Sequence, residues 1–88
     1  MTISAVRIHP DDNVVCLLRD HDTGARPQLA GTTAPPVTTA VPMGHKVALV
    51  AIAPGAAVVK YGAVIGHATR AIARGDHVHL HNLEGAPP

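Results

Sequence analysis

The stretch AIAPGAAVVKYGAVIGHATRAIARGDHVHLHN, residues 51–82, contains one short phrase twice. The pattern A-I-A-x-G-x-x-V runs from Ala51 to Val58 and returns from Ala71 to Val78, twenty residues later. In each copy the isoleucine is an apolar anchor, and the glycine supplies the positive φ that a tight turn needs without steric cost. The valine then begins the next strand. The two copies predict two equivalent corners in a compact bent sheet with pseudo-two-fold symmetry.

Short strands are expected around these corners. The β-rich runs are ISAVRI, NVVCLL, HKVALVAI, AVVKYG, AVIGHAT and HVHLHN. Residues 19–44 are rich in Pro, Gly, Thr and Asp, and we expect a long loop there with one short hairpin within ARPQLAGTTAPPVTTAV. We therefore predict a single, mostly β domain over residues 1–88, with one or two single-turn helices near AIAPG and AIARG and a frayed tail at residues 83–88.

The composition argues against several classes of protein. Among its 88 residues the chain has one Tyr, no Phe or Trp and a net charge of +1, which does not suit a nucleic-acid binder that stacks bases on aromatic rings. No apolar run reaches the roughly 18 residues that span a bilayer. The N-terminal stretch lacks the pattern of a signal peptide. The one cysteine, Cys16, excludes an internal disulfide. We expect a cytoplasmic protein that binds neither membrane nor nucleic acid.

Three blocks carry a resemblance to a known family. These are GHKVAL, KYGAVIGHAT and GDHVHLHN, within residues 44–82, and DDNVVCLLRD near the start supports them. Together they resemble the SAF domain, a β-clip fold, and more closely the N-terminal domain of the altronate and galactarate dehydratase family. The resemblance spans most of the chain except residues 26–43. It implies a β-clip built from short strands.

The resemblance also implies a function. A whole dehydratase of this family continues into a much larger C-terminal domain, whereas this sequence stops at Pro88. We therefore expect the small subunit of a two-component lyase that eliminates water, or sulfite, from a sugar acid or related 2-hydroxy acid, as in sulfolactate sulfo-lyases. A larger catalytic subunit would be its partner and would hold most of the divalent metal, Fe2+ or Mn2+. The isolated chain would be inactive and could form a homodimer.

Such an elimination needs a base, cations for the substrate carboxylate and an acid for the leaving group. His45 and Lys46 follow a glycine at a strand start and are candidate catalytic residues. Neighbouring residues of a strand point to opposite faces, so one of the two faces the site, and we favour His45. The alternative is a surface pair at the end of a strand.

Lys60 and Tyr61 lie between the two copies of the repeat. Lys60 is a candidate for binding the substrate carboxylate, and Tyr61 is a candidate catalytic hydrogen-bond donor or acid. Two simpler interpretations stand beside these. In a chain without Phe or Trp the tyrosine is also a natural core filler, and the lysine is also an ordinary solvated side chain.

The final run HVHLHN places His77, His79 and His81 at alternate positions. On an extended strand they share one face, with Val78 and Leu80 toward the core. Imidazoles suit a transition metal or proton transfer. Same-face residues lie about 6.5–7 Å apart, so at most two converge on one ion.

The block HLHN carries the family likeness. His79 and His81 are therefore the preferred catalytic and metal-binding candidates, and Asn82 is a substrate-binding candidate. A subunit interface or a polar exposed face would also account for the histidines.

Two other functions remain open at the level of sequence. A stand-alone SAF module would bind a ligand or support assembly without catalysis, and it would have no large partner. A third interpretation is a chaperone-like domain of a secreted appendage. The absence of a signal sequence argues against it, because such domains work outside the cytoplasm. The combination of KYG, IGHA and HVHLHN favours the lyase subunit, because a generic SAF module has no need of it.

Overall fold

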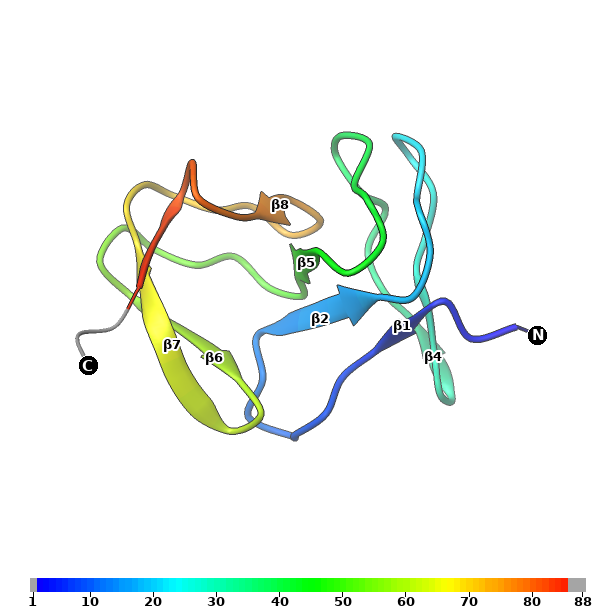
Figure 1. Cartoon of the computed structure of the whole chain (residues 1–88), viewed down its shortest axis with the longest axis horizontal. Helices are drawn as coiled ribbons and strands as arrows, with labels where there is room; N and C mark the ends of the chain where they lie inside the picture. The colour runs from blue at the N-terminus through cyan, green and yellow to red at the C-terminus, as the bar shows by residue number, and fades with distance from the viewer. Residues whose placement is uncertain (1, 86–88) are drawn as a thin grey trace.

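Short strands and tight turns make up the fold. The computed structural model describes residues 2–85, and within them it contains nine strands and no helix (Figure 1). None of these described residues forms a helix that could cross a membrane. The strands are β1 (Ala5–Val6), β2 (Val14–Leu17), β3 (Gln28–Leu29), β4 (Thr32–Thr33), β5 (Lys46–Ala48), β6 (Ala57–Lys60), β7 (Ala63–Ala68), β8 (His77–Val78) and β9 (Leu83–Gly85).

The strands form three antiparallel groups. A four-stranded sheet has the order β1-β2-β5-β8, a three-stranded sheet has the order β6-β7-β9, and β3 with β4 forms a separate hairpin. In Figure 1, β2 and β5 occupy the middle of the molecule, β6 and β7 lie to one side and β1 and β4 to the other. This all-strand arrangement confirms the mostly β class that the sequence predicts.

The two copies of the sequence repeat form a pair of corners that contact each other. Ile52 and Ile72 face one another as an isolated antiparallel bridge, with both backbone N–H groups donating to the opposite carbonyl at 2.8 and 2.9 Å. Three residues after Ile52, Gly55 turns the chain with φ of 80°, and three residues after Ile72, Gly75 does so with φ of 87°. The predicted pair of equivalent corners is therefore confirmed.

The corners are turns and not the single-turn helices that we expected. The Ala56 N–H donates to the Ala53 carbonyl at 3.0 Å, and the Asp76 N–H donates to the Ala73 carbonyl at 3.0 Å. Each bond closes a four-residue turn with a left-handed glycine at its third position, and this φ ends a right-handed helical turn at once. The expectation of short helices near AIAPG and AIARG is wrong for this reason.

A second pair of corners lies in the first half of the chain. His21 and Val41 form the same kind of isolated bridge, and Gly24 and Gly44 follow each of them by three residues with φ of 85° and 84°. Position for position, these corners precede the first pair by 31 residues. The residue that forms the bridge is His, Val or Ile, depending on the corner. In the sequence the glycine is therefore the one residue that all four corners share.

Equivalent hydrogen bonds extend this symmetry beyond the corners. The Gly44 N–H donates to the Leu17 carbonyl at 2.8 Å, just as the Gly75 N–H donates to the Ala48 carbonyl at 2.8 Å. Each partner in the second half again lies 31 residues after its counterpart in the first. The fold is thus two similar halves, each built around one pair of corners.

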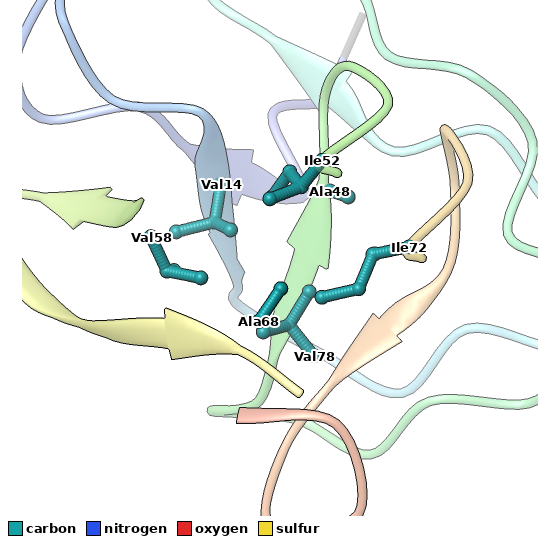
Figure 2. Close-up of a cluster of buried hydrophobic side chains, with 7 residues drawn as sticks. All are labelled: Val14, Ala48, Ile52, Val58, Ala68, Ile72 and Val78. Atoms are coloured by element: carbon teal, nitrogen blue, oxygen red, sulfur yellow. The ribbon is translucent and has the colours of Figure 1, made fainter. Parts of the chain in front are cut away.

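Each half has its own small core. The cluster in the second half joins side chains from β2, β5, β6, β7 and β8 with the two corner isoleucines, and Figure 2 shows them pointing toward one another. It comprises Val14, Ala48, Ile52, Val58, Ala68, Ile72 and Val78. The cluster in the first half comprises Ala5, Val15, Leu17, Val37, Val41 and Val47. Small and β-branched residues fill both, as close packing of short strands requires.

Two segments have more structure than the sequence indicates. Within residues 19–44, the expected hairpin is present as β3 and β4, but the rest of this loop forms the second pair of corners. The expected tail at residues 83–88 is not frayed over Leu83–Gly85, which pair with β7 as β9, and residues 86–88 lie outside the described part. Gly66 permits this pairing, since a Cβ there would lie 2.1 Å from the Glu84 carbonyl oxygen.

Candidate functional site

Three histidines gather where the two halves of the fold meet. His45 follows the corner glycine Gly44 and directly precedes β5. His77 lies in β8, which pairs with β5 so that Val47 faces His77, and His79 follows the end of that strand. The strand pairing therefore brings residues 45, 77 and 79 together although 32 residues separate the first two. We call these three side chains the histidine triad.

The rings of the triad lie in direct contact. The Nδ1 atom of His45 is 2.8 Å from the Nε2 atom of His77. The rings of His45 and His79 stack with centroids 4.4 Å apart and 23° between their planes, and those of His77 and His79 stack at 5.4 Å. One candidate ligand nitrogen from each ring lies within 4.8 Å of the other two. All three side chains are half-buried, so one side of the triad stays open to solvent.

The surroundings of His77 and His79 favour the neutral form of both imidazoles. Burial lowers the pKa of His77, and the charges of His45, His81, His79 and Lys46 lower it further. Burial also lowers the pKa of His79, with added repulsion from His45, Lys46 and His81. A neutral imidazole has an unprotonated ring nitrogen, which can accept a proton or bind a metal ion.

HVHLHN does not form the continuous strand that we predicted. The strand β8 ends at Val78, and residues 79–82 form a turn that leads into β9. Val78 is fully buried as expected, but Leu80 is 83% exposed, so its predicted core position is wrong. The turn breaks the strand alternation and explains why His79 reaches His45 instead of continuing a flat row of histidines.

Asn82 holds this turn in place. Its Oδ1 atom accepts the His79 N–H at 2.9 Å, and its Nδ2 atom donates to the His77 carbonyl at 2.8 Å. The side chain is 4% exposed, and both ends of its amide are used within the turn. Asn82 therefore positions two members of the triad, and its binding of substrate stays a prediction.

A hollow of about 240 Å3 lies beside the triad. His77 lines both the triad and the hollow, and His81 and Arg70 stand at its exposed edge. The Arg70 guanidinium donates to the His81 carbonyl at 2.8 Å, which holds its positive charge there. The remaining lining residues are Thr38, Thr39, Ala71, Asp76 and Asn82. A basic group beside neutral imidazoles suits a small carboxylate ligand.

The structure brings together several of the residues that the sequence singled out. His45 and His79 belong to the triad, Lys46 is half-buried at the start of β5 next to it, and His81 is exposed with its ring 5.4 Å from that of His77. His81 is not among the three residues whose donor atoms converge, and the predicted pairing of His79 with His81 as metal ligands stays a prediction.

The structure also adds two residues. His77, for which the sequence gives a weaker signal than for its neighbours, is the central member of the triad, and Arg70 lies beside it without any signal in the sequence. The alternate spacing of the histidines was the available signal for His77, whereas HATRA gives none for Arg70.

Lys60 and Tyr61 lie apart from this site, at the tip of the β6–β7 hairpin, which Figure 1 shows on the opposite side of the molecule from β8. The Lys60 ammonium lies 4.8 Å from the centre of the Tyr61 ring. Tyr61 is 58% exposed with φ of 57°, so the interpretation of Tyr61 as a core filler is wrong. Neither residue belongs to the triad or lines the hollow beside it, and their roles in binding and catalysis stay predictions.

These observations define a class of protein. It is an all-strand domain with paired glycine corners and a cluster of histidines on one face. The comparison with known families is more specific. The chain belongs to the altronate/galactarate dehydratase SAF domain family, which matches residues 3–86. The family resemblance expected from the sequence is thereby confirmed.

Characterised relatives show where the similarity lies. The chain is 42% identical to the altronate dehydratase of Bacillus subtilis over 92% of its own length but 16% of the relative. It is 36% identical to the galactarate dehydratase (L-threo-forming) of Escherichia coli over 94% of its length and 16% of the relative. It is 42% identical to the alpha subunit of the (2R)-sulfolactate sulfo-lyase of Chromohalobacter salexigens over 54% of its length and 51% of the relative. The chain thus corresponds to a small part of the dehydratases.

Proposed function

We propose that the chain is the small SAF component of a lyase that eliminates water, or sulfite, from a sugar acid or a related 2-hydroxy acid. The observation that carries the proposal is the histidine triad beside the hollow edged by Arg70 and His81. A larger component of the same family would be its partner and would hold most of the substrate and metal machinery. We place the complex in the cytoplasm, where the lone thiol of Cys16 stays reduced.

The relatives support both parts of this proposal. Two of them are dehydratases, in which the matched region is a small segment of a much longer chain. The sulfo-lyase relative is itself described as a subunit, and the match covers about half of it. Elimination from an acid is common to all three names, so we propose the same reaction type for the complex that contains this chain.

The residues of the site suit parts of that reaction. Elimination begins when a base removes the proton next to the carboxylate, and an acid then protonates the leaving group. His77 lines both the triad and the hollow, so its neutral imidazole can accept the first proton, with the rings of His45 and His79 packed against it. Arg70 and Lys46 can hold the carboxylate through charge-assisted hydrogen bonds. The exposed position of His81 suits protonation of the leaving group.

A divalent ion held mainly by the larger component, Fe2+ or Mn2+, would stabilise the negative charge that develops on the carboxylate oxygens. The triad would fit Fe2+ better than Mn2+ as a neighbouring ion. Imidazole nitrogens suit iron, whereas manganese prefers oxygen ligands, which the triad lacks. The proton transfers described above belong to the chain's own side chains.

A stand-alone binding module remains the second candidate, and one observation favours it. A hollow of about 610 Å3 lies beside the β3–β4 hairpin, and none of the triad residues lines it. Its lining is mostly apolar or small and comprises Ile3, Gln28, Leu29, Ala30, Gly31, Thr32 and Thr33. A module that binds a small apolar ligand would use this surface and would need no large partner.

Purification from the native cells distinguishes the two functions. We expect a tagged copy to recover a much larger partner in fixed stoichiometry, detected by native mass spectrometry. That complex should then release water or sulfite from a 2-hydroxy acid when divalent metal is added, whereas the chain alone should not. Recovery of a lone monomer or homodimer would contradict the lyase proposal and favour the binding module.

A further inference from the structure

We propose that His45, His77 and His79 form a binding site for a first-row transition-metal dication of the zinc type on this chain itself. This inference goes beyond the lyase role, in which the partner holds most of the metal, and it concerns the state in which none of the three imidazoles acts as the base, because a nitrogen bound to an ion cannot accept a proton. The inference rests on the convergence of three donor atoms within 4.8 Å of one another.

The geometry is close to that of a three-histidine site. Nitrogens bound to zinc at about 2.0–2.1 Å lie about 3.3 Å from each other in a tetrahedral arrangement. The His45 Nδ1 and His77 Nε2 atoms are already 2.8 Å apart, and one donor nitrogen from each of the three rings lies within 4.8 Å of the other two. Small rotations of the half-buried rings are enough to close the difference, provided that each imidazole carries its proton on the nitrogen facing away.

The chemistry of the donors selects the ion. The triad offers imidazole nitrogens and no carboxylate, a set that suits zinc, copper, nickel or iron and disfavours magnesium and calcium, which prefer oxygen. The nearby charge of Lys46 opposes a dication, so we expect binding weaker than at a closed structural zinc site.

The surrounding residues hold the ligands and leave one side open. The amide of Asn82 fixes the backbone of both His77 and His79, and the corner at Gly44 fixes the position of His45. Three protein ligands at a half-exposed site leave a fourth position free, which is the pattern of metal sites that bind water or a small anion. The hollow edged by Arg70 adjoins His77 and gives such a ligand a place beside the ion.

Titration of the untagged, metal-free chain with Zn2+ by calorimetry tests this site, with Mg2+ as the control ion. We expect one equivalent of Zn2+ to bind and Mg2+ not to bind. Removing a metal ligand should weaken binding by at least ~10-fold, so His45→Ala, His77→Ala and His79→Ala should each show that loss. The matched control is His67→Ala, an exposed histidine on β7 outside the triad, which should bind within ~2-fold of the original chain.

His81→Ala separates this site from the pair of ligands that sequence spacing favours. The triad predicts that this variant keeps its affinity, whereas a site built from His79 and His81 predicts a loss equal to that of His79→Ala. Absence of Zn2+ binding, equal binding by all variants, or an equal loss in His81→Ala would each overturn the assignment. If a triad variant fails to fold, long-range 1H–15N spectra of the original chain with Zn2+ should show metal-induced shifts at one ring nitrogen of residues 45, 77 and 79 but not 81.

Discussion

The Nδ1 atom of His45 lies 2.8 Å from the Nε2 atom of His77, and this contact joins the two pseudo-symmetric halves of the molecule. His45 follows the last corner of the first half, and the residue that matches it 31 positions later, Asp76, follows the last corner of the second half. His77 is the next residue along the chain. The site therefore arises where equivalent corners of the two halves meet, and its chemistry comes from residues that the symmetry does not repeat.

The lowered pKa of His77 predicts a pH dependence of stability. Its folded pKa lies below that of a free histidine, because burial and the neighbouring cations disfavour the protonated ring. The unfolded chain therefore binds the proton first, and stability should fall as the pH decreases below about 6.5. Urea unfolding of the metal-free chain at pH 7.5 and 5.5 should show this loss, and His77→Gln should reduce it. A ring titration of His77 by NMR with a midpoint at or above 6.5 would contradict the account.

The two repeat glycines should differ in their tolerance of alanine. Gly55→Ala adds a methyl group in open space, so it should cost only the left-handed φ, about 1 kcal/mol in the free energy of unfolding. Gly75→Ala has the same φ problem and also places its Cβ 2.1 Å from the Pro36 carbonyl oxygen, so it should cost more than about 3 kcal/mol. Chemical denaturation of both variants measures the difference. Equal losses would show that the close approach at Gly75 is not present.

The pairing of β9 with β7 can be tested through another glycine. A Cβ at Gly66 would lie 2.1 Å from the Glu84 carbonyl oxygen, so Gly66→Ala should separate the strands and expose the amides of residues 83–85 to hydrogen exchange. Gly85→Ala is the matched control on the partner strand, because nothing lies within 4 Å of a Cβ there. If the amides of residues 83–85 exchange as fast in the original chain as in Gly66→Ala, β9 does not pair with β7 and this segment is frayed, as the sequence indicates.

Asp12 should stabilise the turn near the N-terminus, in which it accepts a hydrogen bond from the His9 N–H, through its negative charge. Burial raises the pKa of Asp12, but hydrogen bonds from the backbone N–H groups of Gly62, Tyr61 and His9 outweigh it, and the net pKa is lowered. Its contribution to stability is thus present above the unfolded pKa of about 3.9 and is lost as the pH falls through the lower folded value. Asp12→Asn should be less stable than the original chain at pH 7, and the gap should narrow at pH 3. A gap of the same size at both pH values would rule out this role for the charge.

The sequence was sufficient for the class of fold and for one pair of corners, because the repeat around Ile52 and Ile72 conserves both anchor and glycine. It could not reveal the equivalent pair at His21 and Val41, where the glycine is the one shared residue. The alternate spacing indicates the histidines as candidates, but their convergence depends on the turn that Asn82 holds after Val78. Strand alternation predicted a flat row, and no local pattern indicates that the row bends toward His45.

The central claim is that the triad takes part in an elimination reaction carried out with a larger partner. The most direct measurement is the turnover of a 2-hydroxy acid by the purified complex carrying His77→Ala, compared with the complex carrying His67→Ala. General acid–base contributions of about 100-fold or more predict a drop of that size in kcat for the first variant, with the partner still bound, and no change for the second. Full turnover by the His77→Ala complex would contradict the account.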